Sequence, residues 1–153
     1  YIMVLTTTSN HELFKMGQKR GIQVNNIIMR DEVHKIKWSG NYIINLNHSG
    51  QNGAHWTTFI IKNKTAIFID SFGAIAPLEI IKYCMKNKIK LGYNSYIQQN
   101  LNAQSCGYYC LEAIKFLQHK NDYELFESAN EFINLFVSST KMNEKILLKM
   151  TKI

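Results

Sequence analysis

Two apolar runs joined by a short polar turn constrain the fold of this chain more than any other feature. The runs cover residues 56–62 and 65–70, and Asn63-Lys64 lies between them. Short runs rich in Ile, Phe and Thr on either side of such a turn are typical of an antiparallel β-hairpin. The start of the first strand is then adjacent to the end of the second, so residues 15 positions apart in sequence meet at one end of the hairpin.

Patterns on either side of the hairpin predict an α+β domain, with a small mixed or antiparallel sheet flanked by helices. Ser9 and Glu12 form a capping-box pattern that opens a helix through about Lys19. Pro77 suits the first turn of a second helix. The other predicted elements are strands at 42–48 and 93–98 and helices at 77–87, 105–119, 122–136 and 141–150. No stretch rich in Gly, Ser or Pro forms a linker, so we expect one domain over residues 1–153.

The composition excludes several classes of protein. Hydrophobic residues make up 46% of the chain and charged residues 19%, which excludes a disordered chain. No apolar run approaches the roughly 20 residues that span a bilayer, and the N-terminal segment lacks the pattern of a signal peptide. We therefore expect neither membrane association nor secretion. Three cysteines are too few for a disulfide scaffold and fit a reducing intracellular compartment.

The chain is basic, with a net charge of +7 and a pI of about 9.3. A basic surface attracts polyanions, so non-specific DNA binding is one expectation. Solvated surface lysines, encoded by an A/T-biased genome, explain the charge equally well. A catalytically idle DNA-binding module is an alternative for the whole chain, although no motif of the usual nucleic-acid-binding families is present.

Cys106 lies where a polar, extended segment turns into the helix predicted from residue 105. Unpaired backbone N–H groups and the positive end of the helix dipole favour a thiolate at such a position. Gly107 follows and would leave room for a substrate carbonyl to approach the backbone. Taken alone, a small buried cysteine at a helix start is the commoner explanation. Cys106 and Cys110 have no second cysteine pair to complete a zinc site, so we predict no metal.

His55 gives Cys106 a chemical partner at the start of the first hairpin strand. A neutral imidazole there can take the thiol proton and later protonate a leaving amine. The hairpin places Asp70 beside His55, where its carboxylate can fix the imidazole tautomer and stabilise the imidazolium. His48, at the end of the preceding strand, is the reserve candidate for the base.

A side-chain amide would complete a catalytic centre by donating to the oxyanion of a tetrahedral intermediate, together with the backbone N–H of the cysteine. Losing one such donor typically costs about 10²–10³ in rate. Gln98, Gln99 and Gln104 all lie upstream of Cys106, and these physical arguments do not choose among them.

The order of these residues resembles that of adenain, the adenovirus-type maturation protease, whose clan includes the proteases of SUMO and other ubiquitin-like proteins. The matching segments are GAHWTTFII, AIFIDSFG and QNLNAQSCGYYC. In adenain-type enzymes the oxyanion glutamine stands seven residues before the nucleophile, and this spacing selects Gln99. The resemblance implies that Trp56 shields the catalytic histidine. It further implies that Trp56, Gly53 and Gly107 line a narrow groove for a small residue, typically glycine, before the scissile bond.

The resemblance implies a cysteine endopeptidase with a His55-Asp70-Cys106 triad and Gln99 in the oxyanion hole. We expect a monomeric viral maturation protease that cleaves capsid or scaffold precursor proteins in the virion or the infected cell. The chemistry requires no cofactor, and DNA or an activating peptide is an expected stimulator. Adenain's activating peptide is bound through a disulfide, however, and the nearest cysteine here is Cys84, on the apolar face of a predicted helix.

Two alternatives share the same catalytic residues. One is a deubiquitinase or SUMO-type isopeptidase, which would also favour glycine before the scissile bond. The other is an acetyltransferase of the kind found among bacterial effectors of the clan. Hydrolysis and acyl transfer share a thioester step, so the triad does not separate them.

Overall fold

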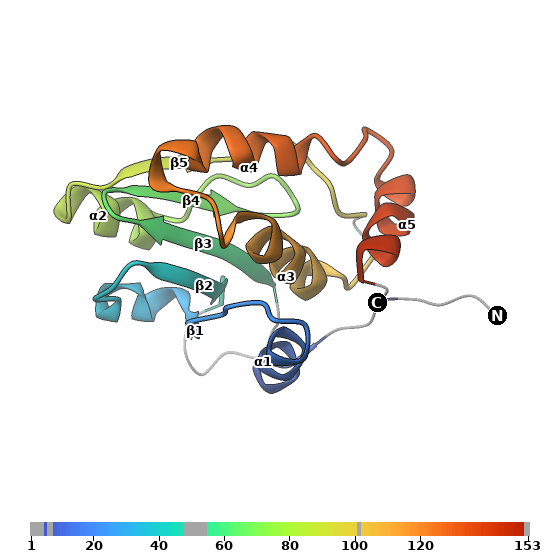
Figure 1. Cartoon of the computed structure of the whole chain (residues 1–153), viewed down its shortest axis with the longest axis horizontal. Coiled ribbons are helices and arrows are strands. Elements are labelled where there is room, and N and C mark those ends of the chain that lie inside the picture. The colour runs from blue at the N-terminus through green and yellow to red at the C-terminus, as the bar shows by residue number, and fades with distance from the viewer. Residues whose placement is uncertain (1–4, 6–7, 48–54, 101, 152–153) are drawn as a thin grey trace.

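The fold is built on a five-stranded mixed β-sheet (Figure 1). The computed structural model describes residues 5, 8–47, 55–100 and 102–151. The strands lie side by side in chain order: β1 Asn26–Met29, β2 Gly40–Asn45, β3 Trp56–Lys62, β4 Thr65–Ile69 and β5 Lys90–Tyr93. The two inner pairs, β2–β3 and β3–β4, are antiparallel, and the two outer pairs are parallel. The predicted α+β class with a mixed sheet is confirmed.

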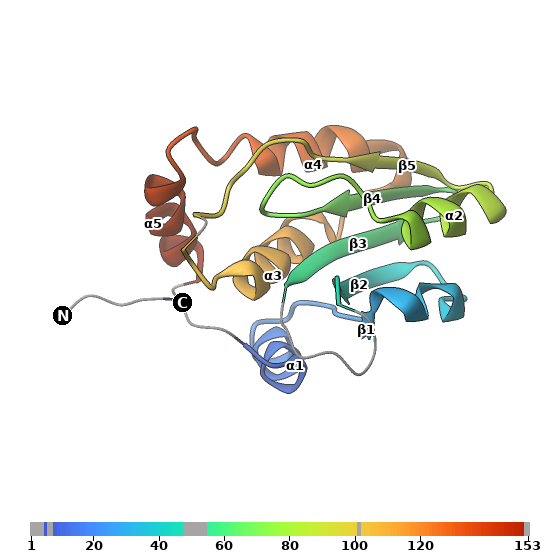
Figure 2. The ribbon, with the colours of Figure 1, turned by 180° about the vertical axis from the view of Figure 1, so that it is seen from behind.

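Helices cover both faces of this sheet. They are α1 Asn10–Lys19, the 3-10 helix η1 Arg30–Lys35, α2 Leu78–Lys86, α3 Cys106–Leu117, the 3-10 turn η2 Asp122–Glu124, α4 Leu125–Ile133 and α5 Thr140–Thr151. In Figure 1, α3 lies between α4 above and α1 below, with α5 at the right. In the view from behind, α2 and η1 lie at the same side of the molecule (Figure 2). Within the described part of the chain, no helix combines the length and apolar character needed to cross a bilayer.

Two apolar clusters, one on each face, explain the unbroken apolar runs of the central strands. Side chains such as Ile43 and Ile60 pack against α1, α3, α4 and α5, whereas Ile44 and Phe59 pack against η1 and α2. Because successive side chains of a strand point to opposite faces, a strand covered on both sides is apolar at most of its positions.

The hairpin and the first helix form as predicted. Lys62 pairs with Thr65, and Asn63 adopts a positive φ of 56° in the turn between β3 and β4. At the start of α1 the Glu12 N–H donates to Ser9 Oγ at 3.2 Å, and the Glu12 carboxylate accepts from the Ser9 N–H. Pro77 stands immediately before α2, as its N-cap, rather than inside its first turn.

The strand predicted at 93–98 is wrong. The strand runs over Lys90–Tyr93, parallel to β4, and no strand follows it over residues 94–98. Beyond Tyr93, the side chain of Asn94 takes the place of the next pair of backbone hydrogen bonds between β4 and β5. The Asp70 N–H donates to Asn94 Oδ1, and Asn94 Nδ2 donates to the Asp70 carbonyl, both at 3.1 Å. A side-chain amide thus ends the β4–β5 pairing at the residue that was predicted to orient the histidine.

Candidate active site

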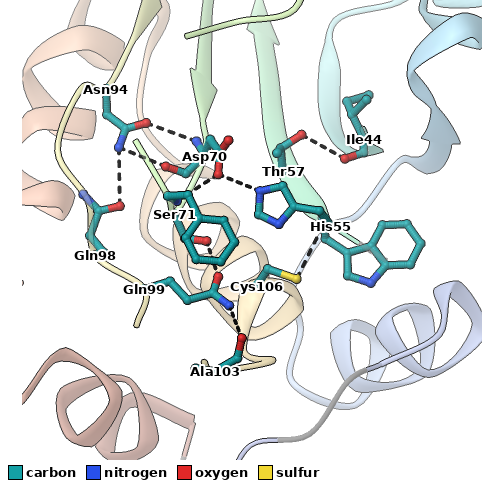
Figure 3. Close-up of polar contacts among 12 residues, drawn as sticks. Ile44, His55, Thr57, Asp70, Ser71, Asn94, Gln98, Gln99, Ala103 and Cys106 are labelled. Atoms are coloured by element: carbon teal, nitrogen blue, oxygen red, sulfur yellow. Dashed lines mark hydrogen bonds and ion pairs between the residues drawn. The ribbon is translucent and has the colours of Figure 1, made fainter. Parts of the chain in front are cut away.

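Cys106 is the first residue of α3, and its sulfur faces the start of β3 (Figure 3). The backbone N–H of Trp56 points at Cys106 Sγ from 3.5 Å. The side chain is mostly buried, with 6% of the residue exposed. The predicted helix start is therefore correct, and the thiol lies against the strand whose preceding residue is His55.

His55 is oriented by Asp70 across the end of the hairpin. The distance between His55 Nε2 and Asp70 Oδ1 is 2.7 Å, and Asp70 is only 1% exposed. Because this bond occupies Nε2, Nδ1 is the ring nitrogen that can exchange a proton with the thiol. The ring of Phe72 covers the imidazole, with 4.8 Å between the ring centroids.

Opposing influences set the charge of His55. Burial lowers its pKa, but hydrogen bonds with Asp70 and Cys106 and the negative charges of both groups outweigh burial and raise the pKa to about 9. The imidazolium lies between two acidic groups and is stabilised by both. The raised pKa therefore favours the protonated imidazole of His55 at neutral pH.

The carboxylate of Asp70 is itself held in place by its neighbours. Besides His55, Asp70 Oδ1 accepts from the Phe72 N–H at 2.9 Å, while Asn94 holds the backbone of Asp70 on both sides. The Gly73 N–H donates to the Asp70 carbonyl and closes a turn in which Gly73 has a φ of +73°. A side chain at Gly73 would also come within 2.9 Å of the Tyr96 backbone, so this turn requires glycine.

Gln99 is buried beside the segment that leads into Cys106, and its amide has a fixed orientation. Ser71 Oγ donates to Gln99 Oε1 at 2.6 Å, and Gln99 Nε2 donates to the Ala103 carbonyl at 2.8 Å (Figure 3). Because an amide nitrogen carries two hydrogens, this group is able to donate a second hydrogen bond. Of the other candidates, Gln98 donates to the Tyr96 carbonyl. Gln104 is exposed.

Solved structures of other proteins share the fold described above. No family model and no curated protein matches the sequence. Among solved structures, the ASFV pS273R protease matches with a TM-score of 0.58 and 14% identity, over 93% of this chain and 66% of that chain. A structure of AvrA with IP6 and CoA matches with a TM-score of 0.54 and 11% identity, over 90% and 66%. The chain thus spans about two thirds of the length of both proteins.

This chain shares its fold with the ASFV pS273R protease and with AvrA. The central domain of the uncharacterized Lpg1148 protein from Legionella pneumophila also matches, with a TM-score of 0.51 and 12% identity, over 96% of this chain and 94% of that domain. The resemblance inferred from three short segments is confirmed at the level of the fold.

The structure shows contacts of Trp56 and Gly107 that could not be predicted from the sequence. Trp56 is 6% exposed, and its indole N–H donates to the Thr8 carbonyl at 3.0 Å. At Gly107 a Cβ would lie 2.4 Å from Thr8 Oγ1, so the glycine allows Thr8 to pack closely against the start of α3. Gly53, predicted to line the groove, and His48, the reserve base, lie outside the described residues.

The other two cysteines of this protease-like fold have different environments from Cys106. Both are buried free thiols, Cys84 on α2 and Cys110 one turn further along α3. Burial raises the pKa of Cys84 to about 11 and raises the pKa of Cys110 well above its ordinary value. Neither thiol is therefore activated at neutral pH.

Two supporting residues, Ser71 and Asn94, were missed in the sequence. Ser71 follows Asp70 directly and orients the Gln99 amide 28 residues away. Asn94 makes two hydrogen bonds with the backbone of Asp70, which lies 24 residues earlier in the sequence. Both partners are distant in sequence, so no local spacing indicates them. Their only signal is a small polar residue at the end of an apolar strand.

Proposed function

We propose that this chain is a cysteine peptidase whose nucleophile is Cys106. The observation that carries the proposal is the imidazole of His55, held at 2.7 Å by a buried carboxylate and hydrogen-bonded to the Cys106 side chain. In that position one side chain can both generate a thiolate and deliver a proton.

The reaction follows from these positions. The Cys106 thiolate attacks a peptide carbonyl carbon, and a C–S bond forms as the carbonyl oxygen becomes an oxyanion. The Gln99 amide and the Cys106 backbone N–H donate to this oxyanion. His55 gives its proton to the leaving amine as the C–N bond breaks, and it then takes a proton from the water that hydrolyses the thioester.

The proposed substrates are proteins with a small residue, typically glycine, before the scissile bond. We further propose a role in the maturation of viral structural precursors, in the virion or the infected cell, with DNA as a stimulator. The fold shared with the ASFV pS273R protease and the net charge of +7 support this narrower role.

A peptide library tests the proposal. We expect cleavage after glycine by the wild-type chain and none by Cys106→Ala, measured by mass spectrometry with and without DNA. The matched control is Cys84→Ala, which removes a thiol of the same size far from His55. Cleavage that persists in Cys106→Ala, or no cleavage of any peptide or protein substrate, would contradict the proposal.

Acyl transfer is a second candidate, because AvrA, which shares the fold, was solved with CoA. In that reaction an acetyl group would pass from acetyl-CoA to Cys106 and then to a hydroxyl or amine of a protein. Incubation with acetyl-CoA and peptides separates the two candidates: a transferase adds an acetyl mass to a peptide, whereas a peptidase yields two fragments.

A further inference from the structure

The carboxylate of Glu144, in the last helix, holds both ends of the segment that joins Gln99 to Cys106. Ser105 Oγ donates to its two oxygens at 3.0 and 2.7 Å, and the backbone N–H of Asn100 donates to Oε1 at 3.2 Å. Asn100 directly follows Gln99, and Ser105 directly precedes Cys106. One side chain of α5 therefore fixes the spacing between the proposed oxyanion donor and the proposed nucleophile.

Neighbouring residues of α5 add to this attachment. Asn143, which is completely buried, donates from Nδ2 to the Gln98 carbonyl at 3.1 Å. Thr140 Oγ1 accepts from Asn100 Nδ2 at 3.2 Å. Figure 2 shows α5 beside the end of α3 that begins at Cys106. The contacts reach Asn100 and Ser105 within the segment and Gln98 just before it. They come from one face of one helix, because residues 140, 143 and 144 are neighbours at helical spacing.

The bond from Ser105 is unusual for its position. Ser105 is the N-cap of α3, where a serine hydroxyl ordinarily accepts from a backbone N–H of the first turn. Here it makes no capping bond and donates to Glu144 instead. A charge-assisted hydrogen bond, stronger than a neutral one, thus holds the serine.

We infer that Glu144 is a positioning residue for the oxyanion hole, which it builds by tying Asn100 and Ser105 to α5. The inference rests on the proposed function for its catalytic consequence, but the attachment itself can be measured without activity. In this role Glu144 contacts neither substrate nor the reacting atoms. It keeps the Gln99 amide and the Cys106 N–H directed at one point.

Kinetics test the catalytic consequence. We expect Glu144→Ala to lower kcat about tenfold with KM nearly unchanged, because misdirected donors weaken only the transition state. Glu144→Gln, which keeps an acceptor oxygen, should recover part of the loss. In a Gln99→Ala background the same Glu144→Ala change should cost less, because only the Cys106 N–H is left to misdirect. An equal loss in both backgrounds, or unchanged kcat, would overturn the inference.

Hydrogen exchange tests the attachment independently of any activity. We expect the amides of Gln99 and Ala103 to exchange faster in Glu144→Ala than in the wild type, while the amides of β3 keep their rates. Lys145→Ala, at an exposed neighbouring position of α5, is the matched control and should change nothing. Unchanged exchange at these two amides overturns the inference. Faster exchange in a chain without peptidase activity would support the attachment and reject only the proposed function.

Discussion

At the scale of single residues, the titration of His55 links stability to pH. Asp70 and Cys106 flank the ring, and together they outweigh burial, so the pKa in the folded chain is about 9 against an ordinary value of 6.5. A group whose pKa rises on folding stabilises the fold most when it is protonated in both states. Its contribution is complete below a pH of about 6.5 and is lost as the pH rises through about 9.

The first prediction follows from the expected loss of stability as the pH rises. Between pH 6.5 and pH 9, the melting temperature of the wild-type chain should fall more than that of His55→Gln, in which the titrating group is absent. Asp70→Asn should show an intermediate slope, because it removes one of the two partners of the imidazolium. Melting curves by circular dichroism at half-unit steps of pH measure the slopes. Parallel slopes in all three proteins would contradict the assignment.

The second prediction separates the three thiols. Iodoacetamide should alkylate Cys106 of the folded chain near neutral pH and leave Cys84 and Cys110 unmodified, because burial keeps both of these thiols protonated and covered. His55→Ala should slow the alkylation of Cys106, because the imidazolium partner is lost. Peptide mapping by mass spectrometry gives the rate at each cysteine. Alkylation of Cys110 ahead of Cys106 would show that the nucleophile is misassigned.

At the scale of elements, sequence reasoning succeeded where an apolar pattern was long. The β3–β4 hairpin shows two apolar runs around a turn and α3 shows a helical period, and both are where they were predicted. The edge strands β1 and β5 have four residues each and are only partly buried, so they show no alternation. β5 was misplaced because its parallel pairing with β4 depends on the crossover through α2, which no local pattern encodes.

The third prediction concerns the contact between α3 and the N-terminal segment. Gly107→Ala should destabilise the fold by about 1–3 kcal/mol, because the new methyl group would overlap Thr8 Oγ1 and Leu13. Urea denaturation measures the change. Thr8→Ala removes the overlapping oxygen, which has no hydrogen-bond partner in the described structure, and should restore part of the stability in the double variant. Equal stability of Gly107→Ala and wild type would contradict this packing.

At the scale of the whole molecule, a buried ion pair helps to join α3 to α1 and α5. Arg20, at the end of α1, pairs with Glu112 of α3 and also donates to the Met150 carbonyl of α5. Both charged side chains are at most 10% exposed. These residues are 92 and 130 positions apart from Arg20 in sequence, so the contact ties distant parts of the chain together.

The fourth prediction follows from that burial. Arg20→Ala should cost about 3–5 kcal/mol, because it leaves the Glu112 carboxylate buried without its partner. The double variant Arg20→Met with Glu112→Leu should recover most of this stability, since an apolar pair of similar volume carries no charge to desolvate. Chemical denaturation of the wild type, Arg20→Ala and the double variant measures these stabilities. A double variant as unstable as Arg20→Ala would mean that the lost stability comes from packing and not from charge.

The burial of α3 restricts how the chemistry of this molecule can be tuned. Nine of its twelve residues are buried, and the helix contacts α1, α4, α5 and β3. Packing along the whole length of α3 therefore fixes the position of the Cys106 sulfur. Changes in the reactivity of the Cys106 thiol, as distinct from changes in the stabilisation of the oxyanion, should therefore originate at His55 and Phe72, at the open end of the hairpin.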